Sequence, residues 1–100
     1  MAAALWLAAS AAPVAAETIR VRLEDLAFIP RHVSVRVGDT VEWVNADFVA
    51  HTATARDGEW DVEIPAEGTG RIMLTQTGTV AYYCQYHPGM TGSIAVEKPP

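Results

Sequence analysis

One segment carries most of the information in this chain: residues 80–90, which read Val-Ala-Tyr-Tyr-Cys-Gln-Tyr-His-Pro-Gly-Met. Its first half alternates as a β-strand requires, so Val80, Tyr82 and Cys84 are predicted to face the protein interior together. The second half adds an imidazole at His87 and a thioether at Met90, close behind the Cys84 thiol. The segment therefore predicts a core strand that ends directly at a cluster of metal-binding groups.

These donor groups suit copper. Thiolate and thioether sulfurs are soft ligands and imidazole is intermediate, so the set favours an ion that cycles between Cu(I) and Cu(II). A second imidazole would complete a trigonal set, and His51 is the best candidate because it lies in an apolar, β-branched segment, residues 49–54. Pro88 and Gly89 allow the loop to turn before Met90 returns towards the ion.

Other residues of the same types are assigned structural roles. His32 stands beside Arg31 at the start of a strand with no Cys or Met nearby, so it is predicted to be a solvated surface residue. Met73 faces either inward between Ile72 and Leu74 or outward beside them, and it is interpreted as core filler in preference to a ligand. Trp43 is expected in the core, whereas the sequence leaves Trp60 undecided between the core and the metal site.

Alternating apolar and polar residues indicate an all-β protein. Strands are predicted at residues 18–23, 33–37, 40–44, 71–74, 79–83 and 93–96. Turn signals such as Gly38-Asp39 separate them, and the one candidate for helical structure is a short turn within residues 57–66. Regularly spaced short strands favour a β-sandwich or Greek-key barrel.

The first residues of the chain differ from the rest. At 100 residues, half of them hydrophobic, the chain supports one compact domain. Residues 1–16 carry no charge and end in small residues, which indicates a cleaved signal peptide followed by a mature domain over 17–100. No Lys or Arg precedes Arg20, so the usual basic start of a signal peptide is absent. The run is shorter than the roughly 20 apolar residues of a spanning helix, so export is predicted and stable membrane insertion is not.

The cysteine content and the net charge limit which sites and partners the protein can have. An exported protein with Cys84 as its only cysteine has no internal disulfide, and a bound metal would protect that thiol. The net charge is −5, and residues 57–67 hold five carboxylates, which form either a docking patch for a basic partner or an ordinary solvated loop. The lack of a basic patch argues against nucleic acid as a partner.

On these residues the chain resembles the cupredoxins, the small blue copper electron carriers, and among them the amicyanins. The shared stretches are residues 28–30 (Phe-Ile-Pro), 37–45 (Val-Gly-Asp-Thr-Val-Glu-Trp-Val-Asn), 82–84 (Tyr-Tyr-Cys) and 92–96 (Gly-Ser-Ile-Ala-Val), together with the upstream His51. Two residues between His87 and Met90 match the short ligand loop of amicyanins, whereas plastocyanins, pseudoazurins and azurins have longer loops.

The resemblance implies a Greek-key β-sandwich, a plastocyanin-like domain over residues 17–100, and a type 1 site for one copper ion. It implies His51, Cys84 and His87 as trigonal ligands and Met90 as the weak axial ligand. Two features depart from the family. Thr52 follows His51 where related proteins usually have an Asn that ties the two ligand loops together, so the sequence does not predict that bond. The stretch between His51 and Cys84 is also short for an amicyanin, so the resemblance does not imply a particular redox partner.

Four ligands fill the coordination sphere, and no nucleophile with a base is left over, so an enzyme is not expected. The sequence predicts a periplasmic, monomeric carrier of single electrons between redox proteins, namely a c-type cytochrome, a periplasmic dehydrogenase or both. The alternative is a periplasmic protein that delivers or sequesters copper, although such proteins generally have Met-rich sites and this chain has three Met. Structural zinc is a third reading, in which Met90 would be an odd fourth donor.

Overall fold

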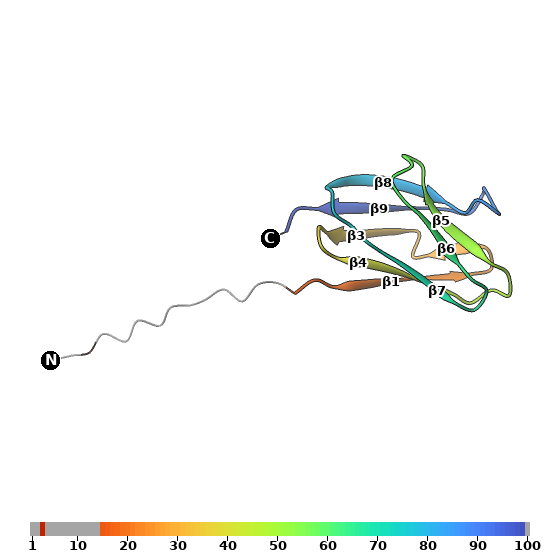
Figure 1. The fold of residues 1–100 in the computed structure, drawn as a ribbon, viewed down its shortest axis with the longest axis horizontal. Helices are drawn as coiled ribbons and strands as arrows, with labels where there is room; N and C mark the ends of the chain where they lie inside the picture. Colours follow the sequence, from red (N-terminus) through yellow and green to blue (C-terminus); the bar gives the residue numbers. More distant parts are fainter. Residues whose placement is uncertain (1–2, 4–14, 100) are drawn as a thin grey trace.

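The computed structural model describes residue 3 and residues 15–99, and in that part of the chain all regular structure is β-strand. Two sheets pack against each other as a sandwich (Figure 1). One sheet has the order β2 (Ala27–Ile29), β1 (Thr18–Glu24), β4 (Thr40–Asn45), β7 (Thr69–Met73). The other has the order β3 (His32–Arg36), β9 (Thr91–Glu97), β8 (Gly78–Tyr83), β5 (His51–Ala55), β6 (Asp61–Ile64).

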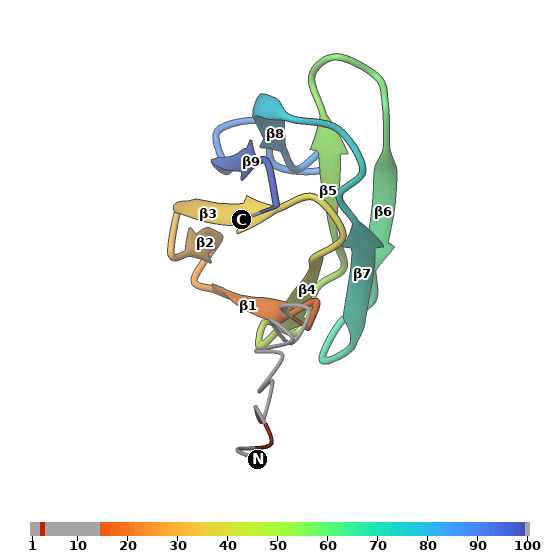
Figure 2. The ribbon, with the colours of Figure 1, turned by 90° about the vertical axis from the view of Figure 1, so that its left-hand side faces the viewer.

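The strand pairing mixes both directions. β1 runs parallel to β4 and β3 runs parallel to β9, while the other neighbouring pairs are antiparallel. A view along the sandwich places β3, β8 and β9 in one layer and β1 and β4 in the other (Figure 2). The predicted all-β sandwich is confirmed, and each of the six predicted strands is present with ends shifted by no more than two residues. No helix in the described ranges is long and apolar enough to cross a bilayer.

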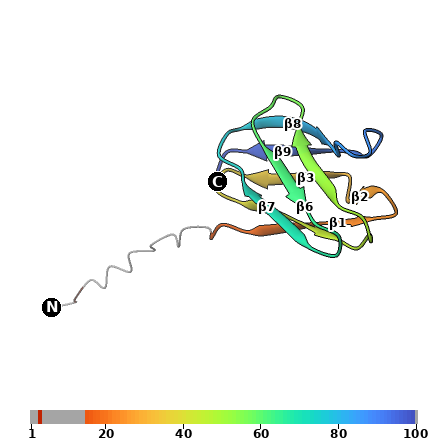
Figure 3. The ribbon, with the colours of Figure 1, turned by 45° about the vertical axis from the view of Figure 1, so that its right-hand side comes forward.

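Two expectations from the sequence are wrong. Residues 57–66 contain no helical turn, because Asp61–Ile64 forms strand β6 and pairs with β5 (Figure 3). Alternation explains the strand, since Val62 and Ile64 turn inward while Asp61 and Glu63 stay exposed. Met73 is not core filler: its side chain is 58% exposed, because the alternation of β7 turns Ile72 inward and Met73 outward.

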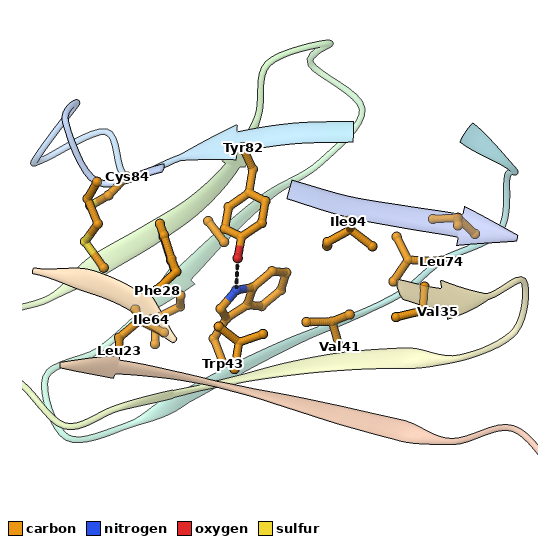
Figure 4. Close-up of a cluster of buried hydrophobic side chains, with 14 residues drawn as sticks. Leu23, Phe28, Val35, Val41, Trp43, Ile64, Leu74, Tyr82, Cys84 and Ile94 are labelled. Atoms are coloured by element: carbon orange, nitrogen blue, oxygen red, sulfur yellow. Dashed lines mark hydrogen bonds between the residues drawn. The ribbon is translucent and has the colours of Figure 1, made fainter. Parts of the chain in front are cut away.

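The core lies between the sheets, and Figure 4 shows Cys84 at one end of it, beside Phe28. Trp43 is fully buried as predicted, and its indole N–H donates to the Tyr82 hydroxyl over 3.3 Å. Trp60, which the sequence left undecided, is partly buried and packs against both rings. Because β8 ends at Tyr83, directly before Cys84, the loop that follows emerges at the end of the sandwich opposite the C-terminus (Figures 1 and 3).

Candidate metal centre

Three donor atoms from two segments of the chain meet at this end of the sandwich. His51 opens β5 and Cys84 follows β8, and both side chains are fully buried. Cys84 Sγ lies 3.7 Å from His51 Nδ1 and 3.8 Å from His87 Nδ1. Metal bonds of about 2.0–2.3 Å in a trigonal arrangement place two ligand atoms about 3.6 Å apart. The Cys84 sulfur therefore lies from each imidazole nitrogen at about the separation that a shared ion requires, and the three donor atoms all lie within 4.8 Å of one another.

The ring of His51 is held by a carboxylate. Its Nε2 lies 2.8 Å from Asp47 Oδ2, so Nε2–H donates to the carboxylate and Nδ1 is left free for a metal. Desolvation acts to raise the pKa of Asp47, but hydrogen bonds from His51 and from two amides outweigh it and hold that pKa below its ordinary value. The sequence reasoning did not identify Asp47, because nothing in the local pattern marks a carboxylate four residues before a ligand.

Asp47 also supports a neighbouring turn. It accepts the N–H groups of Asp25 at 2.9 Å and Leu26 at 3.2 Å. Both residues have positive φ, 52° and 60°, in the hairpin that joins β1 to β2. Such a conformation is costly for residues with a Cβ and persists where surrounding bonds favour it. One carboxylate thus organises both the hairpin and the His51 ring.

Backbone hydrogen bonds close the second ligand segment on itself. The Cys84 N–H donates to Met90 O at 3.0 Å, and the Met90 N–H donates to His87 O at 2.8 Å. Met90 is 4% exposed and belongs to the same buried cluster as Cys84. The loop is therefore a compact unit that holds Cys84, His87 and Met90 close together.

Thr52 ties the two ligand segments together. Its backbone N–H donates to Cys84 Sγ at 3.3 Å, and its hydroxyl accepts the Gln85 N–H at 2.8 Å. The sequence did not predict a tie at this position, because the Asn usual in related proteins is absent. The structure shows that a threonine hydroxyl makes one.

The surface next to the ligands in sequence is apolar. Phe48 is 86% exposed, and Val49, Tyr86, Pro88 and Gly89 are exposed as well. His87 itself is half-buried in the exposed loop, so it is the ligand nearest to solvent. His32 is exposed, as predicted, and its ring bonds the Ser93 hydroxyl.

The donor set fits copper better than other common ions. One thiolate and two imidazoles match the trigonal part of a blue copper site, and a thioether is a ligand that copper tolerates and zinc seldom uses. In residues 15–99, His51, Cys84 and His87 form the only group of three or more His, Cys or acidic donors close enough to share an ion. The geometry therefore provides for one ion.

The chain belongs to the cupredoxin-like domain family, whose profile matches residues 1–96. It is 32% identical to an amicyanin of Paracoccus denitrificans over 94 residues, which cover 88% of this chain and 72% of the relative. It is 30% identical to amicyanin-alpha of Methylorubrum extorquens, with 82% and 74% covered.

Solved structures agree with this placement. An oxidised methionine-to-leucine variant of amicyanin superposes with a TM-score of 0.72 at 28% identity, covering 79% of this chain and 81% of that one. A reduced Cu(I) form of a proline-to-glycine variant gives 0.71 at 30% identity, covering 84% and 86%. The chain is an amicyanin-like cupredoxin, in a family of electron carriers, with His51, Cys84 and His87 positioned to bind one copper ion.

Proposed function

We propose that the protein is a periplasmic one-electron carrier with a type 1 copper site. The ligands are His51, Cys84 and His87, with Met90 as the weak axial donor. The observation that carries the proposal is the distance of the Cys84 sulfur from the two imidazole nitrogens, 3.7 and 3.8 Å. Bound copper would supply the Cu(II)/Cu(I) couple.

The protein contributes a rigid ligand frame. Cys84 extends a core strand, His51 is held by Asp47, and Thr52 connects the two segments. A site whose ligands keep one geometry in both oxidation states has little to reorganise when an electron arrives or leaves. The preformed arrangement supports fast electron transfer, and it supports a carrier over an enzyme because four donors leave no position for a substrate.

The partners are redox proteins, a c-type cytochrome, a periplasmic dehydrogenase or both. The exposed apolar side chains beside His87 in sequence, chiefly Phe48, Val49 and Tyr86, support a docking face through which the half-buried imidazole passes electrons. Residues 17–100 form the mature, monomeric domain in this proposal, and residues 1–16 direct export. Most of that leader lies outside the described residues, so it stays a prediction.

Copper loading tests the proposal. The purified protein should bind one Cu(II) and show the intense visible absorption, near about 600 nm, of a Cu–thiolate bond. Cys84→Ser should remove the colour because the thiolate is its source, and Met73→Ser, which alters an exposed side chain, is the matched control. A persistent band in Cys84→Ser, or a stoichiometry of two, would contradict the assignment.

The same experiment separates the alternatives. A protein that delivers or sequesters copper would hold Cu(I) in a colourless site and exchange it readily with a chelator. A zinc protein would prefer Zn(II) over copper in a competition measured by metal analysis. The buried, constrained donors favour the carrier, since delivery requires ligands that let the ion leave.

A further inference from the structure

We propose that Asp61 is a positioning residue for the copper ligand loop, acting through a directional chain of hydrogen bonds that crosses β6 and β5. The chain ends at the peptide group that directly follows Cys84. The inference concerns the geometry of the ligand loop, and its bearing on copper rests on the function proposed above.

Strand pairing brings the members of the chain together. Asp61 opens β6 and lies opposite Thr54 of β5 in the antiparallel register, and β5 and β6 run side by side in Figure 3. Thr52 precedes Thr54 by two residues, so the alternation of β5 sends both side chains to the same face. Both threonines are buried, with 2% and 8% of their surface exposed, so their hydroxyls depend on protein partners.

The hydrogen-bond distances are short throughout. The Thr54 hydroxyl donates to Asp61 Oδ1 at 2.7 Å, the Thr52 and Thr54 hydroxyl oxygens lie 2.9 Å apart, and Gln85 N lies 2.8 Å from Thr52 Oγ1. The Gln85 side-chain amide also reaches the other oxygen of Asp61, at 3.5 Å. Asp61 therefore meets Gln85 twice, once through the chain and once by a long side-chain contact.

The carboxylate sets the direction of the whole chain. An ionised carboxylate only accepts, and a threonine hydroxyl has one hydrogen to donate. Thr54 gives its hydrogen to Asp61, so it cannot donate to Thr52, and Thr52 must donate to Thr54. The Thr52 oxygen then keeps its lone pairs for the Gln85 N–H. Without the carboxylate, Thr54 could donate to Thr52 instead. The Thr52 oxygen would then accept from Thr54 and Gln85 together, and its own hydrogen would lose Thr54 as its acceptor, so the position of the Thr52 hydroxyl would no longer be fixed.

This orientation matters because Thr52 holds the thiol as well. The residue that accepts the Gln85 N–H also donates its own backbone N–H to Cys84 Sγ at 3.3 Å. Gln85 N belongs to the peptide that follows Cys84. Thr52 therefore makes one hydrogen bond to the Cys84 sulfur and one to the peptide group directly after Cys84. A hydrogen bond with a charged end is stronger than a neutral one and polarises the bonds next to it. Asp61 thereby holds the Cys84 thiol in place although it touches no ligand.

The first test uses the metal-free protein, so that it does not depend on copper. Asp61→Ala and Thr54→Val each break the chain, the second with little change of side-chain volume. In both variants the amide hydrogen of Gln85 should exchange with solvent roughly fivefold to tenfold faster, as expected from the loss of one hydrogen bond. Glu59→Ala removes the same charge from an exposed position two residues before Asp61 without touching the chain, and Thr54→Ser keeps the hydroxyl, so both should exchange like the wild type.

The second test uses the copper-loaded protein. Asp61→Ala and Thr54→Val should shift the Cu–thiolate absorption band in the same direction, and the double variant should shift it no further, because both changes break one chain. Glu59→Ala and Thr54→Ser should leave the band in place. Equal effects of Asp61→Ala and Glu59→Ala would mean that Asp61 acts only as a surface charge, and unchanged Gln85 exchange in Thr54→Val would overturn the proposal. Failure to bind copper with the exchange pattern intact would instead count against the proposed function alone.

Discussion

Met90 and Met73 show at the residue scale how the surroundings decide what a side chain does. Met90 is 4% exposed and lies in the buried cluster that contains Cys84, while Met73 is 58% exposed on β7. The two thioethers are chemically identical. Only the first is in a position to approach a metal, because the ligand loop closes on itself through the Cys84 N–H.

The axial role of Met90 gives a prediction about the reduction potential. Met90→Gln should keep a coloured site but lower the potential, because an amide oxygen is a harder donor and stabilises Cu(II) over Cu(I). Voltammetry of the copper-loaded variant measures the change, with Met73→Gln as the control for the same substitution at an exposed site. A potential that stays the same in Met90→Gln would remove this residue from the ligand set.

At the scale of elements, the aromatic ring of Tyr82 decides which residue can stand at position 92 of strand β9. A Cβ added at Gly92 would lie 2.6 Å from the Tyr82 ring, which itself packs on Phe28 and Trp43. The Tyr82 hydroxyl accepts from Trp43, and burial raises the pKa of Tyr82 to about 12. The Tyr82 ring is therefore packed on the side away from β9, and only glycine fits at position 92 opposite it.

Gly92→Ala should therefore destabilise the protein by about 1–3 kcal/mol, the usual cost of forcing extra volume into a packed core. Urea unfolding of the metal-free protein measures this loss. Gly89→Ala is the matched control, since a Cβ there meets nothing within 4 Å. If the two variants unfold at the same urea concentration, the Tyr82 ring can move aside for the added Cβ, and the prediction is wrong.

The ligand loop gives a second prediction at this scale. Pro88 is exposed directly after His87, so Pro88→Glu would place a charge on the proposed docking face. Electron self-exchange between the Cu(I) and Cu(II) proteins should slow severalfold through repulsion and desolvation, while the visible spectrum stays unchanged. Thr77→Glu adds the same charge to the loop that enters β8, away from the site, and should have little effect. Equal rates in wild type and Pro88→Glu would place the docking face elsewhere.

At the scale of the whole molecule, two carboxylates join strands that are far apart in sequence. Asp39 accepts the Glu17 and Arg36 N–H groups, each at 2.9 Å, and these bonds lower its pKa. Glu42 of β4 binds Arg20 of β1 and Arg71 of β7, and the hydrogen bond from Arg20 is the main cause of its lowered pKa. Both groups stabilise the fold as anions.

Acid should weaken the fold through these groups. Their folded pKa values lie below the unfolded values, near about 4, so the stabilisation is complete above that pH and is lost as the pH falls through the lower, folded values. Asp39→Asn should lower stability at neutral pH and flatten the decline on the acid side. Urea midpoints of the metal-free protein across a pH series measure both effects. An acid slope as steep as that of the wild type would mean that Asp39 does not contribute.

Much of this architecture was predictable because its causes are local. Alternation in a strand follows from adjacent residues, so the inward positions of Val80, Tyr82 and Cys84 could be predicted correctly before any pairing was known. The type of metal-binding group is also a property of single residues, and the thiol, imidazole and thioether within residues 84–90 were enough to predict copper. The strand at residues 61–64 was missed because its alternation rests on only two apolar residues, Val62 and Ile64, which is too few to distinguish a strand from an acidic loop.

The remaining features depend on which strands become neighbours. The hydrogen bond from Thr52 to Cys84 and the chain from Asp61 to Gln85 each join residues whose relation is set by the packing of β5 between β6 and β8. The contact of Asp47 with His51 depends on how the connection between β4 and β5 folds. Periodicity specifies which way a side chain faces but not which strand lies beside it. Strand pairing is a property of the assembled sheets. The metal-binding residues could therefore be predicted from the sequence, whereas the hydrogen bonds that hold them in place are determined only by the tertiary structure.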